Sequence, residues 1–252
     1  MVLLNIWLYV TREMEFAVNQ CNVGCTDCNP LSLLHWDEAV ALYTGSLVGD
    51  RENSVVEGKL LYSIANKRCV DFKTCGAEGK GTVGNSHVNR KIFEWFNNGK
   101  THLLNGDCAL AVIAKTKIVQ SMAIPLVQGT LRFAYDIGRL QDRTPRLLAE
   151  GSVYAAAVLP LVHSCNPDDA QVIYSNMRVG SETTAFRQVL GAFERSYTCL
   201  GITCQDVGGY WDAASQQYFD GAAPCTSTDT KAPNIAGYIP TTPVSNLVRF
   251  PF

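Results

Sequence analysis

Apolar residues recur along most of this chain at the three- and four-residue spacing of an α-helix. Such spacing places side chains on one face of a helix, where they can pack against a core. The first clear stripe is expected to end near Gly45 or Gly49, and the second leads into a glycine-rich loop. The two stripes are Trp36, Val40, Tyr43 and Leu47, and then Leu61, Ala65, Cys69 and Phe72.

Capping residues indicate where further helices start. Ser86 is suited to cap a helix that carries Val88, and the run Asn97-Asn98-Gly99 is expected to weaken or end that helix. The pairs Thr144-Pro145 and Asn166-Pro167 favour two more starts. Threonine and asparagine accept bonds from free backbone N–H groups, and proline fits the first helical turn.

Two prolines fall inside apolar helical segments. Pro125 lies within residues 107–138, and Pro160 lies within the stripe that follows Pro145. Because proline removes a backbone donor, each is expected to bend or split its helix.

The remaining pattern predicts an all-α fold. Two-residue alternation bounded by turns, the mark of a strand, is hard to find in the sequence. From Gly208 onward, glycine, serine, threonine and proline accumulate and the helical period fails. We therefore predict a multi-helix bundle over residues 1–207. An irregular C-terminal tail over residues 208–252 would pack on that domain or on a neighbour.

The ten cysteines are the most informative feature of the composition. Disulfides persist in oxidising compartments, and a 252-residue chain does not need them to complete a core. Cys25-x-x-Cys28 matches half of a zinc knuckle, but no second such pair follows, so disulfides are favoured over zinc. The connectivity stays open. The candidates are Cys21, Cys25, Cys28, Cys69, Cys75, Cys108, Cys165, Cys199, Cys204 and Cys225.

The apolar segment at the start, Val2 to Val10, has no basic residues before it and no small-residue cleavage pattern after it. It is predicted to be a helix of the folded protein. If the cysteines are oxidised, a targeting segment must have been removed or must lie outside this numbering. Met1 need not then be the native start.

Charge and hydropathy argue against two classes of partner. The net charge is −2 and no run of lysine or arginine occurs, which argues against binding of nucleic acid. The longest apolar stretch, Ala109 to Val127, contains Lys115, Lys117 and Gln120. It is predicted to be a buried helix rather than a membrane span.

Several segments together resemble the repeat unit of algal iron-assimilation proteins of the high-CO2-induced periplasmic type. The resemblance implies a secreted, periplasmic or cell-surface protein linked to iron uptake. Members often carry two or more units, whereas this chain has the length of one. The matching segments are residues 35–47 (HWDEAVALYTGSL), 58–69 (GKLLYSIANKRC), 128–135, 158–160 and 204–209, within residues 10–212.

The candidate ligands for iron are His35, Asp37 and Glu38, with Glu13 and Glu15 as possible partners from another helix. Ferric iron prefers carboxylate oxygen and tolerates imidazole. His35 and Glu38 are three positions apart and share a helix face, while Asp37 points elsewhere. The alternative is that these acids only favour the positive end of the helix dipole.

No sequence motif of nucleophilic, zinc-protease or nucleotide chemistry occurs, so the protein is predicted not to be an enzyme. Two functions remain. One is an extracytoplasmic iron-binding module without catalysis, which takes up iron or another metal ion. The other is a structural or interaction domain without metal, whose tail contacts copies of itself or another surface protein.

Overall fold

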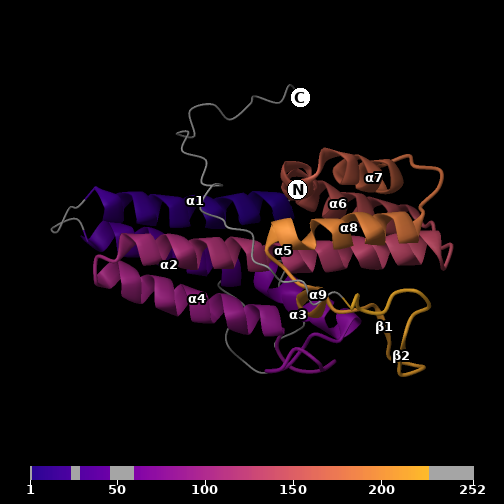
Figure 1. The fold of residues 1–252 in the computed structure, drawn as a ribbon, viewed down its shortest axis with the longest axis horizontal. Helices are drawn as coiled ribbons and strands as arrows, with labels where there is room; N and C mark the ends of the chain where they lie inside the picture. The colour runs from indigo at the N-terminus through magenta and orange to yellow at the C-terminus, as the bar shows by residue number, and fades with distance from the viewer. Residues whose placement is uncertain (1, 24–28, 46–59, 227–252) are drawn as a thin grey trace.

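The computed structural model describes residues 2–23, 29–45 and 60–226. Over these ranges the chain is helical, which confirms the predicted all-α class (Figure 1). The helices are α1 Val2–Asn22, α2 Asn29–Thr44, α3 Leu61–Phe72, α4 His87–Leu104, α5 Cys108–Gly138, α6 Pro145–Cys165, α7 Pro167–Met177, α8 Phe186–Leu200 and α9 Cys204–Val207.

Helix α5, 31 residues long, is shared by two helical bundles (Figure 1). Its N-terminal half packs with α1 and α4, and α2 packs against these two helices. Its C-terminal half packs with α6 and α8, and α7 packs against these two helices. Helix α3 lies beside its middle. The buried apolar side chains form one cluster across both bundles, so the described residues have a single core.

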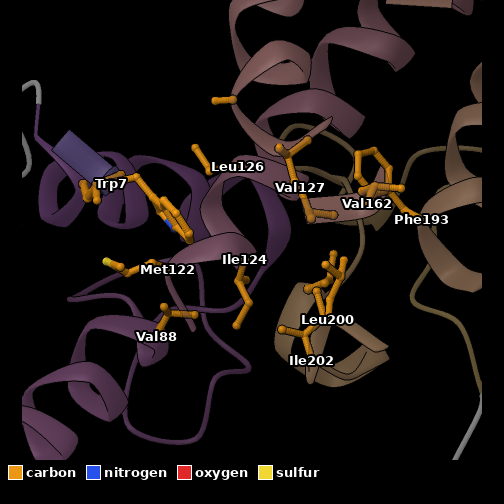
Figure 2. Packing of buried hydrophobic residues seen from close by; sticks show 14 of the residues in the cluster. Trp7, Val88, Met122, Ile124, Leu126, Val127, Val162, Phe193, Leu200 and Ile202 are labelled. Atoms are coloured by element: carbon orange, nitrogen blue, oxygen red, sulfur yellow. The ribbon is translucent and has the colours of Figure 1, made fainter. Parts of the chain in front are cut away.

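The core is continuous through the middle of α5. Met122 and Ile124 face the first bundle, where Trp7 of α1 approaches them (Figure 2). Val127, little more than a turn from Met122, lies toward Phe193 of α8. From residue 122 to 137 nearly every side chain of α5 is buried, because helices surround this segment.

The predicted stripes explain which faces are buried. Leu61, Ala65, Cys69 and Phe72 are all buried on α3, as their spacing requires. The earlier stripe places buried aromatic side chains on α2, which ends at Thr44 as expected. Its last member, Leu47, lies outside the described residues.

Gly99 does not end α4, which continues to Leu104, so the expected termination at residues 97–99 is wrong. The glycine has a different role. A Cβ atom on Gly99 would lie 2.1 Å from Cζ2 of Trp36, which is fully buried on α2. The missing side chain therefore lets the two helices approach closely around the indole ring.

Neither proline splits its helix, while the bend that was the other expectation stays a prediction. Helix α5 is continuous through Pro125, and α6 is continuous through Pro160. Pro125, Ile124 and Leu126 are all buried in the core. We attribute the continuity of α5 to this packing, which offsets the lost backbone hydrogen bond.

Helices begin at all three predicted positions, but only two of the three predicted side-chain caps form. Ser86 Oγ accepts from Val88 N at 3.2 Å, and Asn166 Oδ1 accepts from Asp168 N at 3.0 Å and Asp169 N at 3.4 Å. Thr144 stands at the start of α6 without a capping bond from its side chain.

Replacing Asn166 with alanine is expected to lower the free energy of unfolding by about 1 kcal/mol, because two backbone donors of α7 lose their acceptor. Thr144→Ala is the matched control, with an expected change near zero. Urea denaturation of both variants measures the difference. Equal losses for the two would contradict the assigned role of the Asn166 cap.

The segment after residue 207 is less irregular than predicted. Trp211–Asp212 (β1) and Gln217–Tyr218 (β2) form an antiparallel hairpin. Strands of two residues are too short to show alternation in a sequence. The segment packs on its own domain, with Tyr210 stacked on Phe72 at 5.6 Å between ring centroids. Residues 227–252 of the predicted tail lie outside the described part.

All eight cysteines within the described ranges are paired in four disulfides, which fits an oxidising compartment. One bond ties α1 to the start of α5, and another ties α6 to α8. Cys25 and Cys28 lie outside the described residues. The pairs are Cys21–Cys108, Cys69–Cys75, Cys165–Cys199 and Cys204–Cys225.

Among the described residues, α5 and α6 are long and apolar enough to cross a membrane by length and composition. Half of the most apolar window of α5 is buried in the fold, as the helix was predicted to be. In α6 the buried share is 28%, so much of this apolar helix faces outward. The expectation that no helix spans a membrane stays a prediction.

Candidate metal centre

Helices α1 and α2 lie antiparallel and bring three of the predicted ligands together. Ser32 Oγ of α2 donates to the Ala17 carbonyl oxygen of α1 at 2.8 Å. One turn further along α2, His35 lies opposite Glu13 of α1. Glu38 follows His35 by three positions, on the same face of α2, as its spacing predicts.

The imidazole of His35 is the centre of the group. Its Nδ1 lies 2.7 Å from Oε2 of Glu13 and 3.3 Å from Oε2 of Glu38. One ring nitrogen therefore faces two carboxylates at once, although it can give a proton to only one of them. One ligand atom from each residue lies within 4.8 Å of the other two.

The three side chains differ in how much of their surface is exposed. The Glu13 and His35 side chains are 17% and 27% exposed, whereas Glu38 is 49% exposed. The group therefore has a protein-facing side and an open side. The Phe16 ring lies 5.4 Å from the imidazole, centroid to centroid, and fixes one flank of His35.

The two other predicted acids are engaged elsewhere. Both oxygens of Asp37 accept from Lys100 Nζ of α4 at 2.8 Å, on another side of α2. Glu15 lies 3.7 Å from Lys115 of α5. The structure thus brings Glu13, His35 and Glu38 together and leaves Asp37 and Glu15 out of the group.

This arrangement can hold a metal ion in place of a shared proton. Two carboxylate oxygens and one imidazole nitrogen are hard and borderline donors, a set that suits iron and also zinc. With three protein ligands on a half-open surface, further positions around an ion would be filled by water or a small ligand.

A second group of charges is partly buried and is paired, as buried charges must be. Arg68 bonds Asp71 at 3.0 Å, and Arg132 lies 3.6 Å from both Asp71 and Asp136. Burial raises the pKa of Asp136, while a hydrogen bond from Tyr210 at 3.0 Å and the charge of Arg132 oppose that rise. With two cations and two anions, this group links α3, α5 and the segment after α9.

Comparison of the chain with known proteins gives no relative from which a site could be transferred to it. No family model, curated protein or solved structure matches it.

Proposed function

We propose that this protein is an extracytoplasmic module without catalysis that binds ferric iron through Glu13, His35 and Glu38. The observation that supports this most directly is the convergence of their three ligand atoms within 4.8 Å. Two of the residues are neighbours on α2, but Glu13 comes from another helix, so the group exists only in the folded chain.

Two further observations support the proposal. The four disulfides fit an oxidising compartment, and a periplasmic or cell-surface location is the form of it that we propose. His35 and Glu38 also fall within the segment that resembles the algal iron-assimilation repeat. The donor set agrees with the preference of ferric iron for carboxylate oxygen.

The test is a metal titration of the purified, oxidised full-length chain. We expect one ferric ion per chain after desalting, measured by plasma mass spectrometry. Glu13→Gln and Glu38→Gln should each weaken binding at least about tenfold, because a charged ligand is replaced by a neutral amide. Asp37→Asn is the matched control and should bind as the parent does, since Asp37 contacts Lys100 instead.

Three results would contradict parts of the proposal. No uptake above the background of an unrelated protein such as serum albumin would remove the metal function altogether. Equal loss in Asp37→Asn and Glu13→Gln would place the ion elsewhere. Stoichiometric binding of zinc with no binding of iron would keep the site and reject iron.

The alternative is a structural or interaction domain, which the exposed apolar side of α6 favours. Val153 is 40% exposed although the helix is apolar. Uncovered apolar surface of this kind is typical of a contact with another protein or a membrane. Such a domain would take up no ion in the same titration.

A further inference from the structure

A cavity of about 830 Å³ lies apart from the candidate metal centre, with which it shares no residue. Its walls come from the end of α3, the glycine-rich loop after it, the first turns of α4 and α9, and the segment that ends at Thr226. Figure 1 shows α3, α9 and the hairpin side by side in this region. The volume is that of a small-molecule site.

Two disulfides frame the cavity and hold its shape. Cys69–Cys75 closes the turn from α3 into the glycine-rich loop, and Cys204–Cys225 ties α9 to the opposite wall. Between them, Gln128 Nε2 donates to Thr74 Oγ1 at 3.1 Å and to the Val207 carbonyl at 2.8 Å. The walls are thus cross-linked before any ligand arrives, which lowers the entropic cost of binding.

The charged side chains of the cavity are mainly donors. Lys73, Lys80 and Lys91 line it against two acids, Glu78 and Asp206. Asp206 is fully engaged. Its Oδ1 accepts from Lys91 at 2.7 Å, and its Oδ2 accepts from both the backbone N and Oγ1 of Thr203 at 3.0 and 2.8 Å.

Several donors are left without an acceptor among the described residues. Lys80 is exposed on the loop and has no ion pair in the described part of the chain. Lys91 keeps two further N–H groups beyond the one that Asp206 accepts.

Aromatic side chains hold the third lysine at the wall. Nζ of Lys73 lies 3.6 Å from the centre of the Trp211 ring and 5.8 Å from that of Tyr218. A cation over a ring keeps its charge and its N–H groups. Lys73 therefore contributes a positioned charge rather than a neutralised one.

From this surplus of donors we infer that the cavity binds a small anion with phosphate or carboxylate groups, held by Lys80 and Lys91, with Lys73 adding positive charge. Each donor would find the acceptor that it lacks in the folded chain. The α4 N-terminus adds favourable field, although Ser86 already accepts from its first turn. The inference does not depend on metal binding at Glu13, His35 and Glu38.

Calorimetric titration of the full oxidised chain tests this inference with two probes, inorganic phosphate and citrate, at fixed ionic strength. At least one should bind, and the one that binds identifies the class of ligand. Lys80→Gln should weaken binding about tenfold, as expected for loss of one charged hydrogen bond. Lys117→Gln on α5, outside the cavity, is the control and should bind as the parent does.

The inference is overturned if neither probe binds, or if Lys80→Gln and Lys117→Gln lose affinity equally. The second result would show attraction to overall charge rather than to this cavity. Lys80 is exposed, so its variant is expected to fold, and near-UV circular dichroism checks this.

Discussion

Replacing both Cys21 and Cys108 with serine is expected to lower the free energy of unfolding by about 4.5 kcal/mol relative to the parent chain. This disulfide closes a loop with a sequence separation of 87, the longest of the four in the described residues. Loop closure restricts the unfolded chain more when the loop is longer. Because small domains are stable by only about 5–15 kcal/mol, this loss would remove much of the stability of the protein.

The matched control is the pair Cys204 and Cys225, which are also partly buried but have a sequence separation of 21. Its serine variant should lose about 3 kcal/mol by the same relation. Guanidinium denaturation under non-reducing conditions gives both values. A larger loss for the shorter loop would show that strain or local packing, rather than loop closure, governs these bonds.

Replacing Gly99 with alanine is expected to destabilise the protein by about 3 kcal/mol, the upper part of the range for overpacked cores. In an open helix the same change would be favourable by about 1 kcal/mol, because alanine is the better helix former. Here the new Cβ would lie 2.1 Å from Trp36 Cζ2. The indole cannot easily move away, since it is fully buried and its Nε1 donates to the Phe96 carbonyl at 2.9 Å.

Gly191 on α8 provides the matched control. A Cβ atom there would meet only the flexible end of Arg195, at 3.3 Å. Gly191→Ala should therefore be neutral or slightly stabilising, while Gly99→Ala is strongly destabilising. Thermal and urea unfolding of the two variants measures the contrast. A neutral Gly99→Ala would mean that α2 and α4 are not packed tightly around Trp36.

The helices could be predicted from the sequence because burial follows the helical period. The four apolar positions of α3 are all buried, and the Asn166 cap forms as expected. Where prediction failed, tertiary contacts outweighed a local rule. Gly99 and Pro125 both oppose a helix by local preference, and both lie inside one because neighbouring helices pack against them.

The candidate metal centre could be predicted in part. Spacing alone places His35 and Glu38 on one face and Asp37 on another. It does not show which helix lies opposite, so Glu13 was only one of two possible partners, and Glu15 proved to face Lys115. The cavity could not be predicted from the sequence, because its lysines come from separate segments and are flanked by no common motif.

The sharing of α5 by two bundles makes the chain indivisible. Any break between Cys108 and Gly138 would leave each half with an incomplete core, since the middle of α5 is buried on all sides. A fragment that ends within this segment is therefore expected not to fold on its own. The described fold would then be made and lost as a whole.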